Sequence, residues 1–157
     1  MKKTAIFVDV QNIYYTTKEC YNLNFNYKVF INQISESHEI IKAFAYAIDK
    51  NDPKQKQFQR TLESFGFEVK LKPFIKRFDG SAKGDWDVGI TIDILDYAPI
   101  CEKIILLSGD GDFDLLIKKV IDKYGIIVEV FGVKELTSDS IINSASIFTP
   151  ITKEMLF

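Results

Sequence analysis

The segment Thr4-Ala5-Ile6-Phe7-Val8-Asp9-Val10-Gln11-Asn12 is an apolar run followed by two polar side chains, Asp9 and Asn12. Such a run is typical of a strand buried on both faces, and helical periodicity follows it. A second segment, Ile104-Ile105-Leu106-Leu107-Ser108-Gly109-Asp110-Gly111-Asp112, has the same order of features. Open parallel sheets bind ligands outside the carboxyl ends of their strands. If the two strands are neighbours, their polar turns are therefore predicted to face one crevice.

Composition predicts an ordinary folded protein. The 157 residues are expected to form a single domain, residues 1–157, which is long enough to bury most of its apolar surface. A net charge of −2 with 46% hydrophobic residues argues against disorder and against a polybasic tail, although local basic patches are still compatible with nucleic acid. Cys20 and Cys101 are too few and too far apart for a zinc site or a disulfide framework, so we expect both to be reduced.

The sequence shows no membrane or export signal. Met1-Lys2-Lys3 leads directly into a short predicted strand, and no apolar stretch approaches the roughly 20 residues that span a bilayer. We therefore expect a soluble cytoplasmic protein that does not contact the membrane.

Strands and helices are predicted to alternate along the chain. Expected strands cover residues 4–10, 39–48, 67–73, 104–107, 126–133 and 146–149. Expected helices cover residues 12–20, 27–34, 113–124 and 137–143, with another from the capping pair Asp52 and Pro53 to Gly66. This alternation predicts an α/β fold, a three-layer α/β/α sandwich with a mostly parallel, Rossmann-like central sheet.

Residues 88–98 match both a strand and a helix. We favour a helix from about Trp86 to Ala98, because parallel strands need a crossover helix before Ile104. Apolar residues occur on most sides of this helix, which indicates burial or a subunit contact. A homodimer is therefore one hypothesis for the assembly.

Three predicted helix starts carry pairs of carboxylate or amide side chains: Asp9 with Asn12, Asp85 with Asp87, and Asp110 with Asp112. Helix capping or a turn explains each pair about as well as a site does, and Asp112 would be a good N-cap. The joint pattern is more specific. At an effective dielectric near 20, two carboxylates ~5 Å apart repel by roughly 3 kcal/mol, so a cluster needs protons or a metal. A hard divalent cation such as Mg2+ suits oxygen ligands of this kind.

Other acidic residues are expected to have structural roles. Asp93 is predicted to be salt-bridged or solvated, and Asp114 to lie in the first turn of its helix. The single histidine, His38, has no evident serine or cysteine partner. General-base chemistry would therefore fall to a carboxylate or to metal-bound water.

Residues 7–12, residues 83–90 with Asp93 beyond them, and residues 108–113 together resemble the NYN domain family of PIN-like nucleases, specifically its bacterial LabA-like group. The segments occur in the family's order, and the resemblance covers nearly the whole chain. It implies a PIN-like sandwich and Mg2+- or Mn2+-dependent cleavage of RNA. The family's site residues fall on Asp9, Asn12, Asp87, Asp110 and Asp112. Position 11 is Gln where the family frequently has a small Ser, which places a bulkier side chain beside the site.

The resulting hypothesis is a ribonuclease that hydrolyses RNA phosphodiester bonds with metal-activated water. Asp9, Asp87, Asp110 and Asp112 would hold one or two Mg2+ or Mn2+ ions. Asn12 would orient a water molecule or a phosphate oxygen.

A basic and aromatic stretch precedes Asp87. It comprises Lys70, Lys72, Phe74, Lys76, Arg77, Phe78, Lys83 and Trp86. Basic side chains neutralise phosphates and aromatic rings stack on unpaired bases, so Lys76, Arg77, Lys83 and Trp86 are predicted to bind single-stranded RNA. The alternative is a solvated loop with core phenylalanines.

Two competing functions remain open. The first is a PIN-like RNA- or protein-binding module with little catalysis. The second is another Mg2+-dependent phosphoesterase, although Asp9-Val10-Gln11 lacks the Asp-x-Asp of the haloacid-dehalogenase phosphatases. Neither a P-loop nor a Gly-x-Gly-x-x-Gly turn is present, so nucleotide binding of those kinds is disfavoured.

Overall fold

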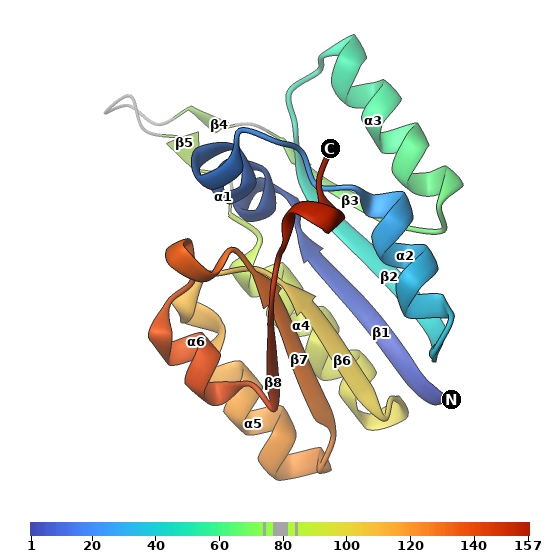
Figure 1. Ribbon diagram of the computed structural model, residues 1–157, viewed down its shortest axis with the longest axis vertical. Helices are drawn as coiled ribbons and strands as arrows, with labels where there is room; N and C mark the ends of the chain where they lie inside the picture. Colours follow the sequence, from blue (N-terminus) through green and yellow to red (C-terminus); the bar gives the residue numbers. More distant parts are fainter. Residues whose placement is uncertain (74, 77–81, 84) are drawn as a thin grey trace.

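The computed structural model describes residues 1–73, 75, 76, 82, 83 and 85–157 (Figure 1). At residues 75, 76, 82 and 83 only the backbone is described. The centre of the fold is a six-stranded sheet with the strand order β3-β2-β1-β6-β7-β8, and every neighbouring pair of strands is parallel. The strands are β1 (Lys2–Asp9), β2 (His38–Asp49), β3 (Glu68–Pro73), β6 (Lys103–Leu107), β7 (Ile127–Gly132) and β8 (Ile147–Pro150).

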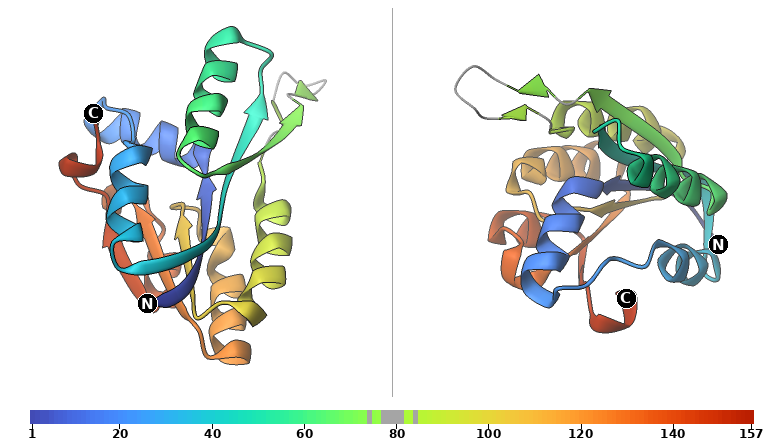
Figure 2. Two further views of the ribbon diagram at one scale, coloured as in Figure 1. Left: turned by 90° about the vertical axis from the view of Figure 1, so that its right-hand side faces the viewer. Right: turned by 90° about the horizontal axis from the view of Figure 1, so that it is seen from above.

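Helices cover both faces of this sheet, as Figure 2 shows with α1 and α2 on one side and α4 and α5 on the other. The α-helices are α1 (Val10–Tyr21), α2 (Tyr27–Ser35), α3 (Pro53–Ser64), α4 (Asp87–Tyr97), α5 (Asp114–Tyr124) and α6 (Asp139–Ser144). Short 3-10 helices are η1 (Ala98–Ile100), η2 (Gly111–Phe113), η3 (Lys134–Leu136) and η4 (Lys153–Met155). The three-layer α/β sandwich predicted from the sequence is confirmed.

Strand β1 shows how the pleat creates two cores. Ala5 and Phe7 pack in a cluster with α4, α5 and α6. Ile6 and Val8 point the other way and pack in a second cluster with α1, α2 and α3. Successive side chains of a strand alternate between faces, so an unbroken apolar run is what a central strand with two covered faces requires.

Several local predictions are confirmed, with boundaries shifted by one or two residues. Residues 87–97 form a helix, and Asp52 caps α3 by accepting a hydrogen bond from the backbone N–H of Lys54. The N-cap assigned to Asp112 is wrong. The 3-10 turn η2 intervenes, and α5 begins only at Asp114, so Asp112 donates its own N–H to Asp110 instead. Asp114 does lie in the first turn of α5.

A two-stranded antiparallel ribbon was not expected from the sequence. It consists of β4 (Ile75–Lys76) and β5 (Ala82–Lys83), which project from the sheet beyond β3 (Figure 1). Each strand has only two residues, which is too short for an alternating pattern to be recognised.

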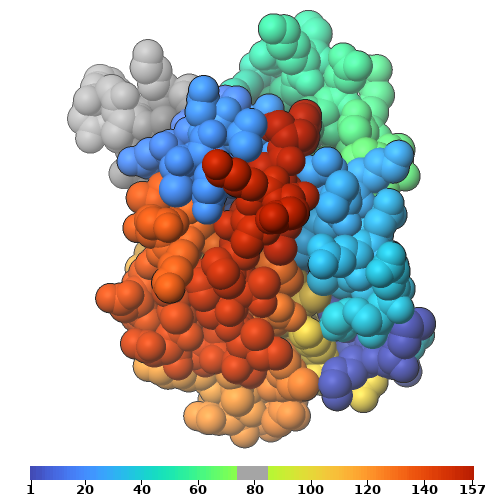
Figure 3. Space-filling model, viewed as in Figure 1, coloured from blue at the N-terminus to red at the C-terminus, as the bar shows by residue number. Residues whose placement is uncertain are grey.

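The C-terminal segment packs between α1 and α2, where Figure 3 shows it on the molecular surface. Phe157 and Asn24 exchange backbone hydrogen bonds of 2.8 Å in both directions. Within the described residues, Cys20 and Cys101 are both free, as expected. No helix in the described part of the chain combines the length and apolarity needed to cross a bilayer.

Helix α4 is apolar on both its inner and outer sides. Ile90 and Ile94 are buried against the sheet, whereas Val88 is 69% and Ile92 54% exposed. The expected burial therefore holds for one side only. The homodimer hypothesis for the outer side stays a prediction.

A buried ion pair joins β6 to β7. Lys103 Nζ lies 2.7 Å from Glu129 Oε1, and both side chains are almost fully buried. Lys103 Nζ also lies 3.0 Å from His38 Nε2, and the Thr149 hydroxyl donates to Glu129. These partners satisfy both charges in a region that would otherwise penalise them.

Replacing Glu129 with Leu should leave the Lys103 ammonium buried without its counter-charge. We expect a loss of about 3 kcal/mol in the free energy of unfolding, measured with urea. The double variant Lys103→Met/Glu129→Leu should recover most of that loss. Glu68→Leu is the matched control, because it removes the exposed pair with Lys42 and should cost under about 1 kcal/mol. Equal losses for the two single variants would contradict a special role for burial.

Candidate metal centre

Two neighbouring strands place the two polar turns at one edge of the sheet. Strand β1 pairs in parallel with β6, with Val8 opposite Leu107, so Asp9 and Ser108 emerge side by side. The Ser108 hydroxyl donates to Asp9 Oδ2 at 3.1 Å, and the Gly109 N–H donates to Asn12 Oδ1 at 2.8 Å. The two strands are therefore neighbours, as the prediction of a shared crevice required.

Asp9 also caps a helix. Its Oδ1 accepts a long, 3.5 Å hydrogen bond from the backbone N–H of Asn12 in the first turn of α1. The sequence left helix capping and a place at the crevice as alternatives for Asp9. The Asp9 carboxylate does both, because Oδ1 faces α1 and Oδ2 faces Ser108 after β6.

Glycine is required in the turn after β6 by close packing. A Cβ on Gly111 would lie 2.6 Å from the Ser138 hydroxyl oxygen, and one on Gly109 would lie 3.0 Å from the Leu136 carbonyl oxygen. A larger residue at either position would force the turn or the η3–α6 segment to shift. The backbone that carries Asp110 and Asp112 is thereby held in place.

Three carboxylates converge above this turn. Asp87, the first residue of α4, contributes one oxygen, and Asp110 and Asp112 contribute one each, all within 4.8 Å of one another. Asp9 is outside this group of three, although the charge of Asp110 raises its pKa and so places it within electrostatic reach. Three of the four metal ligands predicted from the sequence are thus brought together, with Asp9 beside them.

Asp87 and Asp9 both have raised pKa values. Burial, a hydrogen bond with Asp110 and the negative charges of Asp110, Asp85 and Asp9 raise the pKa of Asp87 to about 7. Burial raises the pKa of Asp9 to about 6, although hydrogen bonds from Ser108 and Asn12 oppose the rise. The ion pairs found between described residues involve none of these carboxylates. The donor set therefore fits a hard divalent cation, which would replace the protons as the source of positive charge.

The comparison with known proteins assigns the chain. The model of the NYN domain family matches residues 3–152. The chain belongs to the NYN domain family. The low amplitude and bright protein LabA of Synechococcus elongatus is 29% identical over 125 residues, and that match covers 74% of this chain and 66% of LabA. The chain thus spans just under two thirds of the length of that relative, and the resemblance to the LabA-like group is confirmed.

A crystal structure of a protein of unknown function from Vibrio parahaemolyticus is very similar to this NYN domain. The two sequences are 51% identical, and the structures superpose with a TM-score of 0.94 over 99% of this chain and 96% of the other. The α/β arrangement described above is therefore shared with an experimentally determined structure.

Nearby acidic residues of the NYN domain are structural. Asp85 accepts a hydrogen bond from the backbone N–H of Asp87 at the start of α4. Asp93 is paired with Lys70 at 2.6 Å and accepts a 2.7 Å hydrogen bond from the Tyr46 hydroxyl. The prediction that Asp93 is salt-bridged is confirmed.

The four predicted RNA-binding residues are described to different extents by the structure. Lys76 and Lys83 belong to β4 and β5, but only their backbone is described, and Arg77 lies outside the described residues. Trp86 is half-buried, and its indole N–H donates to the Ala47 carbonyl at 2.8 Å. Lys72 Nζ lies 4.6 Å from the Trp86 ring. RNA binding by this group stays a prediction.

Ser108 was missed in the sequence. Its hydroxyl donates to Asp9 and accepts a 3.2 Å hydrogen bond from the backbone N–H of Asp110, so it connects both turns. Its position directly between a buried strand and Gly-Asp was the available signal. Ser108 is fully buried, and it is the residue that fixes Asp9 relative to Asp110.

The raised pKa of Asp9 makes stability depend on pH. The pKa of Asp9 is about 6 in the folded protein and 3.8 in the unfolded chain. Between pH 3.8 and 6 the folded protein therefore keeps a proton on Asp9 that the unfolded chain has already lost. The stabilisation is present at about pH 4 and is lost as the pH rises through about 6, and Asp87 acts in the same direction. In EDTA, the free energy of unfolding should therefore fall between about pH 5 and 8, and Asp9→Asn should reduce the fall by about 1.4 kcal/mol.

Denaturant titrations of the unmodified protein and of Asp9→Asn, each at about pH 5 and about pH 8, measure this difference in the free energy of unfolding. Asn retains a capping oxygen, so loss of the cap does not mask the effect. Asp114→Asn, which removes a half-buried carboxylate near the same turn, should leave the pH dependence unchanged. The interpretation fails if Asp9→Asn and the unmodified protein lose stability equally.

Proposed function

We propose that this NYN domain is a Mg2+- or Mn2+-dependent ribonuclease that hydrolyses RNA phosphodiester bonds. The observation that carries the proposal is the convergence of Asp87, Asp110 and Asp112 from two separate elements of the fold. The resemblance of the NYN family to PIN-like nucleases supports hydrolysis of a nucleic acid. A cation held by these carboxylates would supply the positive charge that lets an acidic crevice accept an anionic strand.

The proposed division of labour follows from the contacts. Asp87, Asp110 and Asp112 would hold the cation, which when bound lowers the pKa of a coordinated water and neutralises charge on the phosphate. Asp9 accepts the Ser108 hydroxyl and thereby fixes the turn that carries two of the ligands. Asn12 directs its Oδ1 at Gly109, so its amide NH2 group is the part that can donate to a phosphate oxygen or to water.

Asp110→Asn tests the proposed catalytic centre. We expect Mn2+-dependent cleavage of end-labelled single-stranded RNA to fall by more than about 100-fold, since changing even the outer partners of metal ligands costs about 10–100-fold. Asp114→Asn is the matched control and should retain activity. Cleavage by Asp110→Asn at the rate of the control would exclude the assigned site. Cleavage of a phosphomonoester, with RNA left intact, would favour the alternative phosphoesterase.

Metal binding is testable without turnover. Because a ligand of the folded state stabilises it by mass action, millimolar Mg2+ or Mn2+ should raise the Tm at pH 8. The Asp110→Asn variant should show little of this rise, whereas Asp114→Asn should show all of it. RNA binding combined with a full metal response but no cleavage would identify the protein as a binding module.

A further inference from the structure

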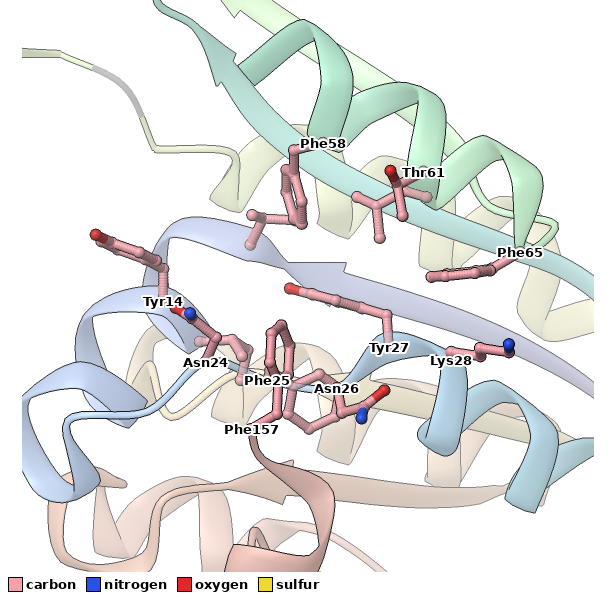
Figure 4. A pocket seen from close by; sticks show the side chains of 13 residues that line it. Tyr14, Asn24, Phe25, Asn26, Tyr27, Lys28, Phe58, Thr61, Phe65 and Phe157 are labelled. Carbon is pink, nitrogen blue, oxygen red and sulfur yellow. The ribbon is translucent and has the colours of Figure 1, made fainter. Parts of the chain in front are cut away.

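A large cavity lies on the side of the sheet opposite α4. It has a volume of about 520 Å3, within the range of roughly 300–1,000 Å3 that is usual for ligand sites, and it is enclosed by α1, α2, α3 and the C-terminal segment (Figure 4). Six of its lining residues are aromatic: Tyr14, Phe25, Tyr27, Phe58, Phe65 and Phe157. The cavity is therefore suited to a flat, largely apolar group.

One polar atom points into this space. Tyr27 is only 7% exposed, with its ring held edge-on by Phe25 and Phe58 at 4.9 and 5.8 Å between centroids. Figure 4 shows the Tyr27 hydroxyl directed into the cavity. Burial and the charge of Asp9 account for its raised pKa, and the hydroxyl has no hydrogen bond within the described part of the chain. A hydroxyl that faces a cavity can bond a polar edge of a ligand.

The cavity reaches the start of α1, the residue next to Asp9 in the chain. Val10 lines it and directly follows Asp9 in the chain. A smaller hollow of about 90 Å3 shares Val10 and Tyr14 with the cavity and continues to Gln11 and Tyr15. We call the cavity and this hollow together the groove; both are lined by Val10 from the first turn of α1, the turn that also contains Asn12.

The groove has the composition of a surface that binds single-stranded nucleic acid. Tyr14 and Tyr15 are 51% and 52% exposed, with their rings 5.5 Å apart. Lys28 lines the cavity and Lys50 lines the smaller hollow. Exposed aromatic rings stack on bases, and lysines near them neutralise the backbone.

We infer that the cavity binds a nucleobase of the RNA strand whose phosphate lies at the carboxylates, with the strand passing over the first turn of α1. The inference rests on the proposed nuclease function and adds a base-binding subsite to it. The base would lie among the aromatic rings, and the Tyr27 hydroxyl would bond one of its polar edge atoms. Neither feature is part of the carboxylate centre.

Filling the cavity tests the inference without removing a residue of the metal centre. Thr61 is exposed on α3 at the rim of the cavity, so Thr61→Trp should block it and leave the core intact. Gln57→Trp, one turn earlier on α3 and outside the cavity lining, is the matched control. Binding of a fluorescent single-stranded RNA is measured by anisotropy in EDTA. Turnover in Mn2+ is measured with RNA and with bis(p-nitrophenyl) phosphate, which has no base.

We expect Thr61→Trp to weaken RNA binding and raise the KM for RNA at least about 10-fold while hydrolysing bis(p-nitrophenyl) phosphate normally. Gln57→Trp should match the unmodified protein in all three assays. Equal RNA affinity of the two tryptophan variants would overturn the inference and leave the cavity to another occupant, such as an apolar peptide. If the unmodified protein cleaves neither substrate, yet Thr61→Trp still weakens RNA binding, the nuclease proposal fails and the base site stands.

Discussion

The parallel pairing of β1 with β6 is the constraint on which the rest of the site depends. Val8 opposite Leu107 fixes the level at which both chains leave the sheet, and Ser108 then connects Asp9 to the backbone of Asp110. A shift of one residue in this register would turn the buried side chains to the opposite faces and separate the polar turns. The two apolar cores thus determine where the carboxylates meet.

The carboxylate cluster is held together against its own repulsion. The pKa of Asp87 is raised to about 7 because burial and neighbouring negative charges both disfavour its ionised form. Such an arrangement costs stability in the metal-free protein near neutral pH, and the surrounding fold offsets that cost. Gly109 and Gly111 lie close against the η3–α6 segment, and this packing favours the position of the turn that carries Asp110 and Asp112.

Much of this architecture could be predicted from the sequence. The unbroken apolar runs at residues 4–8 and 104–107 indicated central strands, and topology rather than periodicity decided that residues 88–98 are helical. The ribbon β4–β5 could not be predicted, since two-residue strands carry no pattern. The capping role of Asp112 was wrong because the sequence does not show the 3-10 turn that intervenes before α5. The aromatic cavity was also missed, because Tyr14, Phe58 and Phe157 are far apart in the chain and only the tertiary fold brings them together.

The position of Trp86 has a practical consequence. It is the only tryptophan of the chain, and it lies between Asp85 and Asp87, with its indole ring packed near Tyr46 and Lys72. Ultraviolet emission from the unmodified protein therefore originates mainly from one chromophore at the border of the carboxylate crevice. The intrinsic fluorescence of Trp86 can therefore be used to follow binding at the carboxylate crevice without attaching a dye.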